Sequence, residues 1–125
     1  MRRLNIMVVD DSNITIRKMT KMLEDLGHHV TYAAVNGAKA VEEYERVRPD
    51  LVTMDITMPD MDGIEATRRI MAKDENAVIM VVTSHGQEQM VMDAIEAGAK
   101  GYVLKPVKPE KLKEHLEAVV EKYLT

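Results

Sequence analysis

The sequence contains no cysteine, no tryptophan and no phenylalanine, and each absence excludes a kind of site. Without cysteine there can be no disulfide, no thiolate metal site and no thiol nucleophile. Four tyrosines are the only large aromatic side chains, so a base-stacking surface for single-stranded nucleic acid lacks its usual residues. The net charge of −4, with basic residues scattered among acidic ones, also argues against nucleic acid as a partner.

Long apolar runs are missing too. Arg2 and Arg3 stand near the start, but polar residues interrupt the apolar run that follows them. No later run approaches the roughly 20 residues that a membrane-spanning helix needs. We therefore expect no signal peptide, no membrane partner and a cytoplasmic location.

What is present is typical of a globular domain. The 125 residues are 46% hydrophobic and 30% charged, a balance that argues against extended disorder. The length fits one domain over residues 1–125, with no output domain attached. With so few aromatic residues, the core must be aliphatic and must use many of the 11 methionines.

Five apolar runs predict the strands of a parallel sheet. They begin about 25 residues apart, which is too far for hairpins and fits strand, crossover helix and strand. They are continuous rather than alternating, as in strands covered on both faces. The runs are residues 4–9, 29–33, 51–54, 77–82 and 101–104.

The segments between these runs have helical spacing and helix-end residues. Ser12, Asn36 and Pro109 are suited to helix starts, and Gly27 and Gly98 to the positions just after a helix. The predicted helices run from 12 to 26, from 36 to 47, onward from 63, from 87 to 97, and from 109 to 123. Alternating strands and helices predict an α/β fold: a flavodoxin-like, doubly wound, five-stranded parallel sheet of order 2-1-3-4-5 with five helices.

Polar side chains follow four of the five predicted strands. Asp10 and Asp11 follow the first strand, Asp55 the third, Thr83 the fourth and Lys105 the fifth. In such a sheet, ligands bind at the carboxyl ends of the strands, so these groups should share one crevice. Three carboxylates repel each other unless a cation joins them, and Mg²⁺ prefers oxygen ligands. The set is suited to bind a phosphoryl group, with a carboxylate as nucleophile and Lys105 as counter-charge.

Each element also has a simpler interpretation. Asp10 and Asp11 alone could cap the next helix, and Thr83 with Ser84 could cap the fourth. Lys105 before a proline indicates only a turn. The location of all these residues at one end of the sheet favours the joint site.

At this point the chain resembles the receiver domain of two-component response regulators, and within that family the stand-alone chemotaxis receivers of the CheY type. The resemblance covers essentially the whole chain, with its motifs in the family's order and spacing. They are Val-Val-Asp-Asp-Ser (8–12), Asp-Leu-Val-Thr-Met-Asp-Ile-Thr-Met-Pro-Asp-Met-Asp-Gly (50–63), Val-Val-Thr-Ser (81–84), Ala-Gly-Ala-Lys-Gly-Tyr (97–102) and Leu-Lys-Pro (104–106).

The resemblance implies a role for each site residue. Asp55 would accept the phosphoryl group, and Lys105 would pair with one of its oxygens. Asp11, Asp55 and the backbone carbonyl of Thr57 would bind Mg²⁺ directly, with Asp10 acting through water or as a secondary ligand. The resemblance also implies a cis peptide bond after Lys105.

Further residues would form the switch and set its timing. The hydroxyl of Thr83 would move onto the phosphoryl group while Tyr102 rotates inward. Thr57 and His85 occupy the two positions that, in the family, influence how water reaches the acyl phosphate. We expect the charge of His85 to modulate autodephosphorylation.

The resemblance also implies partners. A histidine kinase would donate the phosphoryl group, a phosphatase could remove it, and a motor or other target protein would bind the face of the fourth helix, fifth strand and fifth helix. Val91, Ile95, Tyr102 and Leu104 lie on or near that face. Such a protein is a signalling protein, not an enzyme, although it phosphorylates and dephosphorylates itself. An alternative is a phosphorelay intermediate that passes the group to another protein.

Two rival functions and one departure from the family pattern remain at this stage. A Mg²⁺-dependent phosphohydrolase with an aspartyl nucleophile would want an acid two residues after Asp55, where Thr57 stands. A flavin carrier would need a hydroxyl- and glycine-rich loop where Asp10 and Asp11 stand. Val107 follows Lys-Pro where the family often has phenylalanine, so we expect looser packing beside the site.

Overall fold

The computed structural model of the chain describes residues 2–84 and 86–124, in which strands and helices alternate. In chain order they are β1 (Asn5–Val9), α1 (Asn13–Asp25), β2 (His29–Ala34), α2 (Gly37–Val47), β3 (Leu51–Asp55), α3 (Gly63–Lys73), β4 (Ile79–Thr83), α4 (Glu88–Ala97), β5 (Gly101–Leu104) and α5 (Pro109–Tyr123). No helix of these described ranges has the length and apolar character needed to cross a lipid bilayer.

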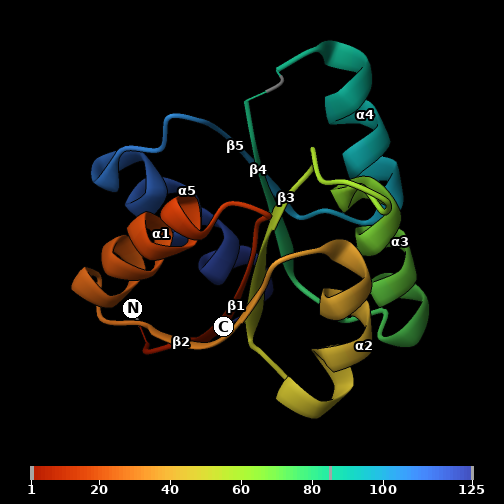
Figure 1. The fold of residues 1–125 in the computed structure, drawn as a ribbon. Coiled ribbons are helices and arrows are strands. Elements are labelled where there is room, and N and C mark those ends of the chain that lie inside the picture. The colour runs from red at the N-terminus through yellow and green to blue at the C-terminus, as the bar shows by residue number, and fades with distance from the viewer. Residues whose placement is uncertain (1, 85, 125) are drawn as a thin grey trace.

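The five strands form one parallel sheet in the order β2-β1-β3-β4-β5, which confirms the predicted fold class and strand order. Figure 1 shows α1 and α5 on one face of this sheet and α2, α3 and α4 on the other. The winding reverses between β1 and β3, which are neighbours in the sheet although β2 lies between them in the chain. The carboxyl ends of β1, β3, β4 and β5 therefore lie along one edge.

Two aliphatic cores hold the layers together. On one face, Leu23 of α1 and Leu116 of α5 pack against sheet residues that include Ile6 and Met80. On the other face, side chains of α2 and α3 pack against alternate residues of the same strands, Met7 among them. Because the strands are covered on both faces, all five residues of β3 and of β4 are buried, as the continuous apolar runs predict.

Side-chain caps fix where three helices begin. The hydroxyl of Ser12 accepts a hydrogen bond from the Thr15 amide at the start of α1. Asn36 and Asp62 accept equivalent bonds at the starts of α2 and α3. α4 begins at Glu88, after Gln87, so the simpler interpretation of Thr83 and Ser84 as its cap is wrong. The cap of α1 is likewise Ser12 and not Asp10 or Asp11.

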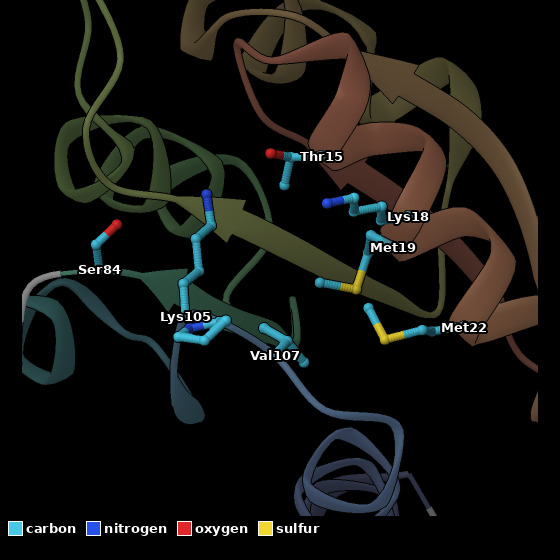
Figure 2. Close-up of a pocket in the computed structure, with 8 residues that line it drawn as sticks. Thr15, Lys18, Met19, Met22, Ser84, Lys105 and Val107 are labelled. Carbon is cyan, nitrogen blue, oxygen red and sulfur yellow. The ribbon is translucent and has the colours of Figure 1, made fainter.

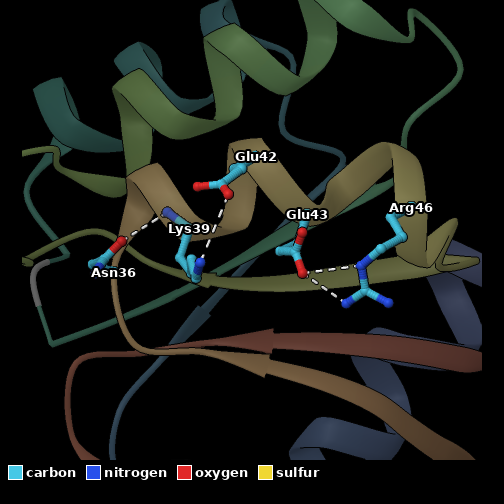
Figure 3. A network of polar contacts seen from close by, with 5 residues as sticks. All are labelled: Asn36, Lys39, Glu42, Glu43 and Arg46. Carbon is cyan, nitrogen blue, oxygen red and sulfur yellow. Dashed lines mark hydrogen bonds and ion pairs between the residues drawn. The ribbon is translucent and has the colours of Figure 1, made fainter.

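The outer face of α2 carries a charged network (Figure 3). Glu43 accepts two hydrogen bonds from the Arg46 guanidinium, at 3.0 and 2.7 Å, and Lys39 lies 3.7 Å from Glu42. These pairs are three residues apart on the surface of one helix, where solvent screens them, so their contribution to helix stability is small. The network stabilises α2 and is remote from the acidic cluster at the strand ends.

A buried histidine joins the start of the sheet to the turn after α1. His28 is 4% exposed, and its Nδ1 accepts a hydrogen bond of 3.1 Å from the Leu4 amide. The neutral ring therefore carries its proton on Nε2, which has no hydrogen-bond partner among the described residues. Burial lowers the pKa of His28, so the folded protein holds this ring neutral.

We predict that His28 makes the fold sensitive to mild acid. The unfolded chain takes up the proton first as the pH falls below the ordinary histidine pKa of about 6.5, because the native pKa is lower. The stability that neutral His28 contributes is therefore complete above that pH and is lost progressively below it. Between pH 7 and pH 5, the free energy of unfolding should fall by about 1 kcal/mol more for the wild type than for His28→Gln. Equal losses in urea titrations of the two proteins would contradict this.

Candidate functional site

The ends of β1 and β3 bring three carboxylates together. Asp10, Asp11 and Asp55 each place an oxygen so that all three atoms lie within 4.8 Å of one another. Asp10 is 4% and Asp55 6% exposed, whereas Asp11 is on the surface. This confirms that the predicted acidic residues meet, and an all-oxygen set of this kind is what Mg²⁺ prefers.

Lys105 supplies positive charge from the opposite side of the site. Its ammonium donates a hydrogen bond of 2.8 Å to Asp10 Oδ2 and lies 3.5 Å from Asp55 Oδ1. The backbone holds it there, because the Lys105 amide donates a 2.8 Å hydrogen bond to the Thr83 carbonyl. The bond from Lys105 to Pro106 is a cis peptide, as the resemblance implies. Asp10 is fixed in turn by the Ser12 amide, which donates to its Oδ1 at 2.9 Å.

The charges in this cluster have opposing effects on the pKa values of Asp55 and Lys105. Burial raises the pKa of Asp55, Lys105 acts to lower it, and the neighbouring Asp10 and Asp11 raise it further, with a net upward shift. Burial alone would lower the pKa of Lys105, but the carboxylates of Asp10 and Asp55 reverse this and raise it. Lys105 is therefore firmly charged, while Asp55 carries a charge that its surroundings leave under-compensated.

The main chain of Asp55 is held by the start of α3. The Gly63 amide donates a 2.8 Å hydrogen bond to the Ile56 carbonyl. A Cβ atom at Gly63 would collide with the backbone carbonyl of Asp55. From the sequence, Gly63 is predicted only as the start of a helix, and this close approach to Asp55 is not foreseen. A glycine at the first position of a helix is the one local feature that could have indicated it.

The other predicted site residues belong to the ends of β4 and β5 and to the loop after β3. Thr83 is fully buried at the end of β4, and β4 pairs with β3, the strand that ends at Asp55. Thr57 is exposed in the loop after β3. Tyr102 is half-buried in β5 and packs against the small cluster under α4. His85 lies outside the residues that the structure describes.

Tyr102 also lines a separate hollow between α4, β5 and α5. It has a volume of about 420 Å³, and its other lining residues include Val91, Leu104 and His115. Leu104 is 53% and Ile95 of α4 55% exposed, so this face presents apolar side chains to solvent. Val91, Ile95, Tyr102 and Leu104 are the residues that the resemblance implies for target binding.

We predict that replacing Asp55 stabilises the metal-free protein. Asp55→Asn removes one of the mutually repelling charges from a buried position, while Lys105 keeps its contact with Asp10. In EDTA at neutral pH, the free energy of unfolding should rise by about 1 kcal/mol. Asp62→Asn, at the exposed start of α3, is the control for a generic loss of acidic charge and should not stabilise. A destabilised Asp55→Asn protein in urea titrations would contradict the account of this cluster.

Comparison with known proteins agrees with this geometry. The model of the response regulator receiver domain matches residues 6–117. The chain is 43% identical over 114 residues to the chemotaxis protein CheY of Thermotoga maritima, covering 91% of this chain and 95% of that protein. It is 45% identical over 109 residues to chemotaxis protein CheY of Bacillus subtilis, covering 87% and 91%.

Solved structures show the same relationship. A CheX–CheY–BeF3–Mg complex from Borrelia burgdorferi contains a chain that superposes with a TM-score of 0.89 at 36% identity, covering 92% of this chain and 87% of that one. Sequence, fold and the acidic cluster with its lysine thus agree, and the chain belongs to the response regulator receiver domain family.

Proposed function

We propose that this chain is a phosphorylation-activated switch of chemotaxis signalling that accepts a phosphoryl group on Asp55. The observation that carries the proposal is the buried Asp55 carboxylate in ion-pair contact with Lys105 inside a three-carboxylate cluster. The relatives named chemotaxis protein CheY support the choice of pathway. The phosphorelay and phosphohydrolase alternatives have no structural feature in their favour.

Each residue contributes a definite part of the reaction. A carboxylate oxygen of Asp55 attacks the phosphorus of a phosphohistidine whose ring carries a proton on its other nitrogen. The P–N bond breaks, its electron pair stays on the ring nitrogen, and the histidine leaves as a neutral imidazole. The ammonium of Lys105 offsets charge on the transferred group. Asp10, Asp11, Asp55 and the Thr57 carbonyl would hold Mg²⁺, which supplies further charge neutralisation when bound. No side chain needs to give up a proton.

Phosphorylation would then bias the face that binds the target. The new group adds roughly −1.5 to −2 of charge and three acceptor oxygens near the ends of β4 and β5. Thr83 would turn its hydroxyl to this group and Tyr102 would rotate inward, reshaping the α4–β5–α5 face with its exposed Ile95 and Leu104. A motor or other target protein would bind there, and a phosphatase would reset the switch. The switch would work in the cytoplasm, and residues 1–125 would form its single receiver domain. His85 and Thr57 would tune the rate of reset.

We predict that Asp55 is the phosphorylated residue. Incubation with acetyl phosphate and Mg²⁺ should add one phosphoryl group by intact-mass measurement. The added mass should disappear in Asp55→Asn, which lacks the nucleophile. The rate of phosphorylation should fall at least about tenfold in EDTA or in Lys105→Met, because each of these two changes removes positive charge that offsets the transferred group. A gain that survives Asp55→Asn would mean that the nucleophile is another residue.

The switch itself is tested with the phosphoryl mimic BeF3⁻ and Mg²⁺. In the wild type, backbone amide NMR signals of α4, β5 and α5 should shift along with those of the site. In Thr83→Ala, signals next to Asp55 should still shift while those of α4 and β5 should stay near their resting positions, because the hydroxyl that links the two regions is gone. Thr83→Ser keeps the hydroxyl and is the matched control. If the α4 and β5 signals of Thr83→Ala shift as they do in the wild type, Thr83 is not part of the switch.

A further inference from the structure

A cavity opens beside Lys105, on the α1 side of the sheet (Figure 2). It has a volume of about 460 Å³, within the range of small-molecule sites. One wall is formed by α1, which contributes Thr15, Lys18, Met19 and Met22. The other wall is the segment after β5, with the stem of Lys105 and Val107.

The size of Val107 contributes directly to this space. Phenylalanine, which many receivers carry at this position, has a larger side chain and would project into the same cavity. The neighbouring methionines are unbranched and adapt to the shape of whatever they contact. Beside the site the structure has an open cavity, and Met19, Met22 and Val107 supply part of its lining.

The cavity is continuous with the phosphorylation site through one side chain. Lys105 lines the cavity along its stem and places its ammonium 3.5 Å from Asp55 Oδ1. A phosphoryl group that contacts both Asp55 and Lys105 is thus separated from the cavity by the Lys105 side chain alone. The cavity lining contains the ammonium groups of Lys18 and Lys105 and none of the three aspartates, so it is better suited to an anionic leaving group than the acidic cluster is.

We propose that this cavity binds the acyl chain of small-molecule acyl phosphates, so that donors with chains of four or more carbons phosphorylate Asp55 faster than acetyl phosphate does. The inference rests on the proposed function of Asp55. In the reaction, an Asp55 oxygen bonds to phosphorus and the bond between phosphorus and the acyl oxygen breaks. The electron pair leaves with the carboxylate, so the products are aspartyl phosphate and a carboxylate anion, with no proton transferred.

Charge and shape favour a small molecule of this class. Its anionic end matches the two ammonium groups, and its apolar chain matches Met19, Met22 and Val107. Burial of two additional methylene groups, the difference between butyryl and acetyl phosphate, corresponds to about a tenfold gain in rate at low donor concentration. The two donors share the same mixed-anhydride bond, so intrinsic reactivity does not predict such a difference.

The test compares the second-order rates of phosphorylation by butyryl and acetyl phosphate, with Mg²⁺, by intact mass. For the wild type we expect a butyryl-to-acetyl ratio of about ten. Val107→Phe narrows the cavity beside Lys105 and should lower the ratio. Val35→Phe, the same substitution at an exposed position that does not line the cavity, should keep the wild-type ratio. Met22→Ser removes apolar contact without filling the space and should also lower the ratio.

The outcomes separate this inference from the proposed function. If acetyl phosphate modifies Asp55 but the wild-type ratio is near one, the acyl-chain site is overturned and the phosphoacceptor role of Asp55 stands. A high ratio that Val107→Phe and Met22→Ser both leave unchanged overturns it as well, because the preference then arises outside the cavity. If neither donor adds a phosphoryl group that depends on Asp55, the proposed function itself fails.

Discussion

The structure of the site depends on one electrostatic constraint: three carboxylates share a small volume with the ammonium of Lys105. Two of the acids, Asp10 and Asp55, are almost completely buried, so water does little to relieve their repulsion. Such an arrangement is costly for the folded state and persists only where the surrounding fold determines the positions of the groups. Its excess of negative charge also suits the site to a bound cation.

The fold imposes this arrangement through the ends of parallel strands. Asp10 directly follows β1 and Asp55 ends β3, and these neighbouring strands fix the separation of the two carboxylates. α3 begins so close to the backbone of Asp55 that its first residue must be glycine. Stability from the two aliphatic cores therefore compensates for the repulsion that the site requires.

The sequence predicts most of this because the informative signals are local. Continuous apolar runs, helix spacing and cap residues identify the elements, and polar residues at strand ends identify the cluster. The errors arise where tertiary packing decides. Thr83 and Ser84 look from the sequence like a helix cap, but Thr83 is fully buried at the end of β4 and α4 begins only at Glu88. The size of the cavity depends on how α1 and the segment at Val107 approach each other, which no local pattern encodes.

The same constraint indicates how the proposed phosphorylation of Asp55 would act on the α4–β5–α5 face. In the resting state Lys105 is closer to Asp10, at 2.8 Å, than to Asp55, at 3.5 Å. A phosphoryl group on Asp55 would compete for that ammonium, and a stronger attraction toward Asp55 would displace the segment after β5. The Lys105 amide donates a hydrogen bond to the Thr83 carbonyl, so a displacement of Lys105 would also act on the end of β4. Because β4 leads to α4 and β5 contains Tyr102, a change in one ion pair would act on both sides of the exposed apolar face.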